Sequence, residues 1–145
     1  MFNFIPNRLA FIVLISACSI ILISMGLRQT FGLFFDAFEK GLGVTRTEFG
    51  LAIGIQMLFW GFFAPIFGLL ADKFGGNKAV FLGFLVFALG IFMLYSGPNT
   101  GIYFQLALGV LVGIALGATA IGVPVSEVGK HFPNETRTIA TGVVT

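Results

Sequence analysis

Four long stretches of apolar residues alternate with short polar segments along the chain. The apolar stretches cover about residues 9–35, 49–71, 79–95 and 102–125, and a fifth helix begins at about residue 135. A helix needs about 20 apolar residues to cross the hydrocarbon core of a bilayer, so each of the four can span a membrane. The pattern predicts an all-α, polytopic membrane fold with four spans and the start of a fifth.

The polar segments between these stretches have the composition of turns. Residues 36–48 combine charges with glycines, which predicts a loop, and Thr45 or Thr47 is available to cap the helix that follows. Residues 72–78 form a short charged turn, whereas residues 96–100 form a turn without charge. After Pro133 we expect a new helix, with Asn134 as its N-cap and Glu135 in its first turn.

Composition supports a membrane environment and excludes several other classes of protein. Apolar residues make up 57% of the 145 residues, 20 more are glycine, and only 10% are charged. A soluble domain carries about 25% charge, and 145 residues cannot bury this much apolar surface behind so thin a polar shell. The high apolar content also excludes a disordered chain.

The residues that carry common enzyme or cofactor chemistry are missing from the sequence. The single cysteine, Cys18, belongs to no CxxC motif or Cys/His cluster, so nothing supports a zinc or redox site. No catalytic triad, metal-ligand spacing or phosphate loop is present. The eight basic residues are spread along the chain and form no patch for nucleic acid. We therefore expect no catalytic residue, metal, cofactor or nucleic-acid partner.

The distribution of basic residues predicts how the chain is oriented. Cytoplasmic loops of membrane proteins are enriched in Lys and Arg. Two basic residues, Lys40 and Arg46, lie in the odd-numbered turns. Five lie at the N-terminus or in the even-numbered turns, namely Arg8, Lys73, Lys78, Lys130 and Arg137. We expect a multi-pass protein of the cell (inner or plasma) membrane with a cytoplasmic N-terminus.

Glycines recur at every fourth position within two of the spans. Gly109, Gly113 and Gly117 share one face of the fourth span, and Gly50 and Gly54 share one face of the second. Small residues at this spacing let membrane helices approach closely. They predict close packing between helices. The alternative is a functional role, in which thin interfaces let the helices of a transporter slide.

Arg28 is a charged residue inside the first apolar stretch. An arginine at the centre of a membrane helix costs about 2.5–3.5 kcal/mol on insertion scales, and such residues usually face a cavity or the interior of a helix bundle. We expect an anionic partner, which is either Asp36 on a continued helix or the carboxylate of a substrate. Alternatively, the helix ends near Arg28 and the side chain extends to the membrane interface.

Two glutamines could contribute to the same site. Gln29 follows Arg28 directly, and Gln56 lies in the middle of the second span. If both spans line one cavity, Arg28, Gln29 and Gln56 could bind the same solute, with Trp60 as part of the wall. The alternative for Gln56 is a hydrogen bond between helices, and for Trp60 it is packing.

The turn after the second span carries the most specific motif. Asp72 ends a helix, where the dipole disfavours an anion, so it needs compensation from Lys73, Lys78 or the N-terminus of another helix. The segment resembles the G-x-L-x-D-[R/K]-x-G turn between helices two and three of the major facilitator superfamily. The matching residues are Gly68, Leu70, Asp72, Lys73 and Gly75, with Lys78 as one of the two basic residues that usually follow.

Shorter segments are similar to one branch of that superfamily, the monocarboxylate and oxalate/formate porters. They are residues 27–32, 45–49, 130–133 and 140–142. In contrast, Gln105 and Leu106 stand near the start of the fourth span, where the family often has a basic residue.

The resemblance implies a fold and a mechanism. It implies a twelve-helix major facilitator fold in two six-helix halves that rock around a central site, of which residues 1–145 are part of the N-terminal half. By the same resemblance, Asp72 and Lys73 form a cytoplasmic latch between the halves, and Arg28 is a candidate ligand for an anion.

The function expected from these observations is secondary transport of small organic anions such as monocarboxylates by alternating access. The expected partners are the lipid bilayer, a small organic anion, a proton or counter-solute, and the missing C-terminal half. The alternative is a small four-helix membrane protein that works as an oligomer, as a minimal exporter or a scaffold or assembly subunit.

Overall fold

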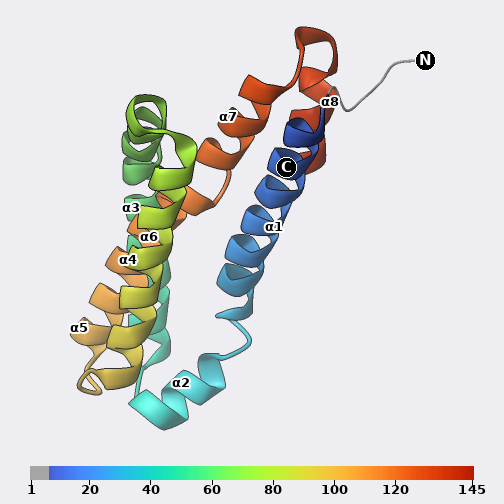
Figure 1. Cartoon of the computed structure of the whole chain (residues 1–145). Helices are drawn as coiled ribbons and strands as arrows, with labels where there is room; N and C mark the ends of the chain where they lie inside the picture. Colours follow the sequence, from blue (N-terminus) through green and yellow to red (C-terminus); the bar gives the residue numbers. More distant parts are fainter. Residues whose placement is uncertain (1–6) are drawn as a thin grey trace.

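The computed structural model describes residues 7–145, and every regular element in that range is helical (Figure 1). In chain order the helices are α1 (Arg8–Thr30), α2 (Phe35–Leu42), α3 (Arg46–Phe74), α4 (Gly76–Ser96), α5 (Gly101–Phe104), the π-helix η1 (Gln105–Leu111), α6 (Val112–Thr119), α7 (Gly122–His131) and α8 (Asn134–Val144).

Four helical segments are long and apolar enough to cross a membrane. They are Arg8–Thr30, Arg46–Phe74, Gly76–Ser96 and the composite segment Gly101–His131, which joins α5, η1, α6 and α7. The prediction of four spans is therefore confirmed. Many large apolar side chains on them face outward, among them Leu58 and Tyr95, which are 73% and 90% exposed. Lipid is the natural environment for such a surface.

The first span is shorter than expected. We predicted a span through residue 35 and a loop over residues 36–48, but α1 ends at Thr30 and a turn over residues 31–34 leads into α2. Helix α2 carries Phe35 and Phe38 on one face and polar residues on the other, so it suits a membrane interface rather than a span. It runs at a steep angle to α1 and leads to α3 (Figure 1).

The capping predictions were correct at one helix and wrong at another. Thr45 caps α3 in a capping box, in which its hydroxyl accepts from the backbone of Glu48 and the Glu48 carboxylate accepts from the backbone of Thr45. Asn134 is the first residue of α8 and not its N-cap, which is Pro133. Pro133 has φ −58° and ψ 155°, and no side-chain hydrogen bond caps this helix.

The fourth span packs against α3 through its predicted glycine face. A Cβ built at Gly109, Gly113 or Gly117 would meet α3 within about 3 Å, and at Gly113 the nearest atom is the Gln56 carbonyl oxygen at 2.8 Å. These glycines let the two backbones approach closely, as expected. The same role is not seen for Gly50 and Gly54, because nothing in residues 7–145 lies within 4 Å of a Cβ built there.

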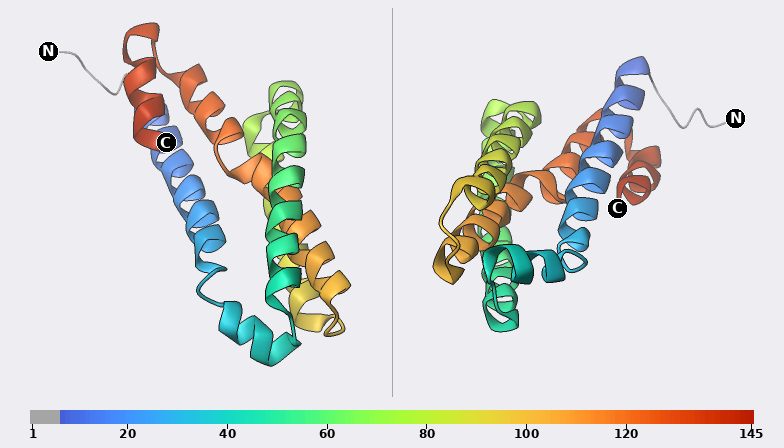
Figure 2. Two further views of the ribbon diagram at one scale, coloured as in Figure 1. Left: turned by 180° about the vertical axis from the view of Figure 1, so that it is seen from behind. Right: turned by 90° about the horizontal axis from the view of Figure 1, so that it is seen from below.

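The helices form two groups that α7 connects. Helices α3, α4, α5, η1 and α6 pack together, whereas α1 lies apart and packs on α7 and α8 (Figures 1 and 2). The fourth span bends at Ala120 and Ile121, between α6 and α7, and this bend carries α7 across to α1. The end of α1 that carries Arg28 contacts α3 through side chains.

Candidate functional site

Arg28 lies in the last turn of α1 and reaches across to α3. Its Nη2 is 3.2 Å from the sulfur of Met57, and its guanidinium carbon is 5.3 Å from the centre of the Trp60 ring. A thioether is a weak acceptor, and an aromatic face contributes about 0.5–2 kcal/mol. Neither contact neutralises the charge, so Arg28 has attractive surroundings but no counter-ion within residues 7–145.

Asp36 does not pair with Arg28, which corrects one of the two expected partners. The expectation required α1 to continue through Asp36, but the helix ends at Thr30 and Asp36 lies on α2 beyond a turn. The alternative that the helix ends near Arg28 is therefore correct for the backbone. The side chain, however, is half-buried against Trp60 and does not extend freely into solvent.

Gln56 is fully buried beside this contact. Its amide Nε2 donates a hydrogen bond to the backbone carbonyl of Leu108, 3.2 Å away on the fourth span. The expected hydrogen bond between helices is thus present. Gln29, the other predicted ligand, is exposed at the end of α1.

Two buried polar atoms at this place have no partner within the described part of the chain. They are Nε of Arg28, a donor, and Oε1 of Gln56, an acceptor. Buried polar groups are almost always hydrogen-bonded, and unpaired ones often mark places with a functional role. The sequence indicated both residues but not the state of these two atoms, and it gave no signal for Met57.

The carbonyl that binds Gln56 belongs to a π-helical stretch. Leu108 lies in the middle of η1, where the backbone is wound more loosely than in an α-helix. Such stretches are rare and occur frequently at functional sites. No residue pattern in this segment distinguishes it from an ordinary apolar helix, so the sequence did not predict it.

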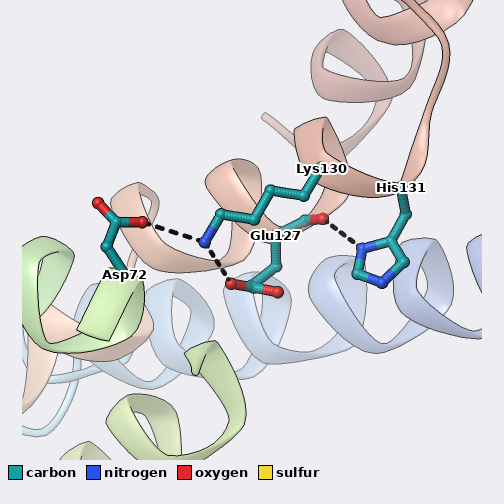
Figure 3. Close-up of polar contacts among 4 residues, drawn as sticks. All are labelled: Asp72, Glu127, Lys130 and His131. Carbon is teal, nitrogen blue, oxygen red and sulfur yellow. Dashed lines mark hydrogen bonds and ion pairs between the residues drawn. The ribbon is translucent and has the colours of Figure 1, made fainter. Parts of the chain in front are cut away.

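A second polar cluster lies at the turn after α3 (Figure 3). Lys130 Nζ is 3.0 Å from Asp72 Oδ1 and 2.9 Å from Glu127 Oε1. The Nδ1 atom of His131 is 2.8 Å from the backbone carbonyl of Glu127. These contacts connect the end of α3 to α7.

The cation paired with Asp72 is Lys130, rather than Lys73 or Lys78. Lys73 lies over the ring of Phe74, with 5.2 Å between its Nζ and the ring centre, and Lys78 is exposed in the first turn of α4. Both Asp72 and Lys130 are well exposed, so the pair contributes at most about 1 kcal/mol to stability. The pair matters because it connects the end of the second span to the end of the fourth.

Two adjacent glycines give this turn its shape. Gly75 joins α3 to α4 with φ 95° and ψ 142°, a conformation that residues with a Cβ rarely adopt. Gly76 lies against the side chain of Glu127, and a Cβ there would clash with that side chain. Gly68, the first residue of the motif, has open space around it. The turn thus combines a link that requires glycine and a close approach with the charged pair.

A large, mostly apolar groove lies away from Arg28. It has a volume of about 510 Å³ and runs between α1, α4 and α7, with mostly apolar walls and with Glu127 and His131 among its lining residues. It begins near Leu9 and reaches Ile20 on α1, so it does not extend to Arg28. The groove is therefore separate from the candidate anion site.

Comparison with known proteins identifies the family. Residues 12–145 match the family model described as Major Facilitator Superfamily. The multi-drug resistance efflux pump PmrA of Streptococcus pneumoniae is 32% identical over 120 residues, which cover 77% of this chain and 29% of that protein. An MFS-type transporter of Aspergillus fumigatus is 30% identical over 140 residues, which cover 94% of this chain and 31% of that protein. No solved structure gives a significant match.

These matches define a multi-pass membrane protein of a transporter family. The chain belongs to the major facilitator superfamily. It spans about 30% of the length of the curated relatives that it matches. Members of this family are transporters, and the match does not show whether the chain belongs to the monocarboxylate and oxalate/formate branch.

Proposed function

We propose that this chain takes part in the secondary transport of small organic anions by alternating access. It would work as part of the N-terminal half of a twelve-helix transporter in the cell membrane, with its N-terminus in the cytoplasm. The observation that carries the substrate class is Arg28, a half-buried guanidinium with no carboxylate partner among residues 7–145.

The geometry around Arg28 suits a carboxylate ligand. Trp60 covers one face of the guanidinium, and the sulfur of Met57 accepts only a weak hydrogen bond from one of its N–H groups. A carboxylate can replace the Met57 contact and accept two parallel hydrogen bonds, which are stronger than those to neutral acceptors. Gln29, at the end of α1, is available as a further donor, and Gln56 lies next to the site on α3.

The cluster around Asp72 supports a transport cycle with alternating access. It ties the turn between α3 and α4 to the end of the fourth span, on the side expected to be cytoplasmic. We propose that Asp72 and Lys73 hold the cytoplasmic side closed in one state of the cycle. Breaking the contact between Asp72 and Lys130 would then accompany opening. A gradient of protons or of a counter-solute would drive the cycle.

Uptake measurements test the substrate class. The protein as its gene encodes it is reconstituted into vesicles, and uptake of radiolabelled formate, lactate and oxalate is measured with and without a pH gradient. Arg28→Gln should raise the KM for the transported anion at least tenfold or abolish uptake. The matched control is Arg46→Gln, because Arg46 is exposed and its guanidinium lies over the ring of Phe35, away from the Arg28 site. Unchanged KM and rate in Arg28→Gln would refute the proposal.

A second candidate function is drug efflux, and the relative PmrA, described as a multi-drug resistance efflux pump, favours it. The same vesicles distinguish the two functions. Drug export would be supported if the vesicles transport a cationic dye and organic anions do not inhibit this dye transport. Uptake of an organic anion that depends on Arg28 would support the first proposal.

A further inference from the structure

The two unpaired atoms on α1 and α3 complement each other. Arg28 Nε carries a hydrogen to donate, and Gln56 Oε1 has lone pairs to accept it. Both atoms are buried, and neither has a partner among residues 7–145. One hydrogen bond between them would satisfy both.

The positions of the two side chains make this bond feasible. Gln56 and Trp60 are four residues apart on α3, so they lie on the same face of that helix. The Arg28 guanidinium already covers Trp60, and its Nη2 contacts Met57, the residue after Gln56. Arg28 and Gln56 therefore belong to one contact region between α1 and α3, and the proposed bond requires the Nε of Arg28 to turn toward Gln56.

We propose that Gln56 is the positioning residue of the anion site, and the proposal rests on the function proposed for Arg28. When a carboxylate binds the two Nη groups, Arg28 leaves the sulfur of Met57 and donates its Nε hydrogen to Gln56 Oε1. This hydrogen bond from Nε to Gln56 fixes the plane of the guanidinium. The edge that carries the two Nη groups then faces the anion. Gln56 then acts through Arg28 and does not touch the substrate.

The same glutamine connects the site to the fourth span. Its Nε2 holds the carbonyl of Leu108 inside the π-helical stretch η1. Gly113 packs directly on the backbone of Gln56, so the two helices are in close contact here. Binding of the anion at Arg28 would therefore act on the π-helical segment of the fourth span through a single amide group.

A double-mutant cycle tests the proposal. Gln56→Met removes both hydrogen bonds of the amide at nearly constant volume, and Arg28→Lys keeps the charge but has no Nε donor. The KM and kcat of anion uptake are measured for the protein as its gene encodes it, for both single variants and for the double variant. Gln56→Met should raise KM about tenfold when Arg28 is present and less than twofold in the Arg28→Lys background.

An equal change of KM in both backgrounds would overturn the proposal, because a purely structural role of Gln56 does not depend on Nε. If Gln56→Met fails to insert into the membrane, Gln56→Asn replaces it, since the shorter side chain keeps the amide but cannot reach both partners. If Arg28→Gln, measured alongside, leaves KM unchanged, the function proposed for Arg28 fails. If Arg28→Lys raises KM and the cycle is additive, only the role of Gln56 fails.

Discussion

Lys130 Nζ lies 3.0 Å from Asp72 Oδ1, so the end of the second span is joined to the end of the fourth although the residues are 58 positions apart. Glu127 binds the same ammonium group and also lies against Gly76 at the start of α4. One lysine therefore connects the charged turn to the fourth span. The contact is exposed, which allows it to break and form again at small cost.

This connection predicts a defect in turnover without a defect in folding. Asp72→Asn should reduce the transport rate about tenfold or more and leave membrane insertion and KM nearly unchanged, because an exposed pair adds little stability. Initial rates in vesicles, together with the amount of protein in the membrane, measure this. Glu39→Gln, which changes an exposed carboxylate on α2, is the control. Normal turnover in Asp72→Asn would remove the proposed latch role.

The backbone of the turn predicts a specific requirement for glycine. Gly75→Ala should lower the free energy of unfolding by about 1–3 kcal/mol, because a Cβ is strained at φ 95° and ψ 142°. Gly61→Ala is the matched control, since Gly61 lies inside α3 with open space around it and alanine favours the helix. Denaturation in detergent, followed by circular dichroism, compares them. Equal stability of the two variants would contradict the prediction that a residue with a Cβ is strained at position 75.

The contact between α3 and the fourth span predicts a different response at two glycines. Gly113→Ala should destabilise the protein by about 1–3 kcal/mol, because the new Cβ would lie 2.8 Å from the Gln56 carbonyl oxygen and the helices must separate. Gly54→Ala places a Cβ in open space and should cause no loss. Thermal unfolding of both variants tests the prediction. A loss of stability at Gly54 alone would show that the helices pack differently.

The sequence predicted much of the fold because long apolar stretches have few alternatives to crossing a bilayer. It predicted the Thr45 cap, since hydroxyl and carboxylate three residues apart form a local capping box. It did not predict the end of α1 at Thr30, because the apolar composition continues through residue 35. In the structure, Phe35 and Phe38 of α2 pack against Phe49 of α3, and a local pattern does not contain such contacts.

The candidate site was predictable in its residues but not in its contacts. A charged residue within an apolar stretch identified Arg28, and the turn motif identified Asp72. The partners Met57 and Lys130 are 29 and 58 residues away, and no local pattern selects them. The π-helical stretch depends on how α3 and the fourth span fit together, which composition does not reveal.

The central claim, that Arg28 binds an organic anion, is tested most directly by the fluorescence of Trp60. Trp60 is the single tryptophan of the chain, and the Arg28 guanidinium lies 5.3 Å from the centre of its ring. The protein as its gene encodes it, with any tryptophan outside residues 1–145 replaced by phenylalanine, is titrated in lipid nanodiscs with formate, lactate and oxalate at constant ionic strength, with chloride as the control. We predict a saturable change in emission for at least one carboxylate that Arg28→Gln abolishes. An identical response in Arg28→Gln, or no response beyond that to chloride, would contradict the account.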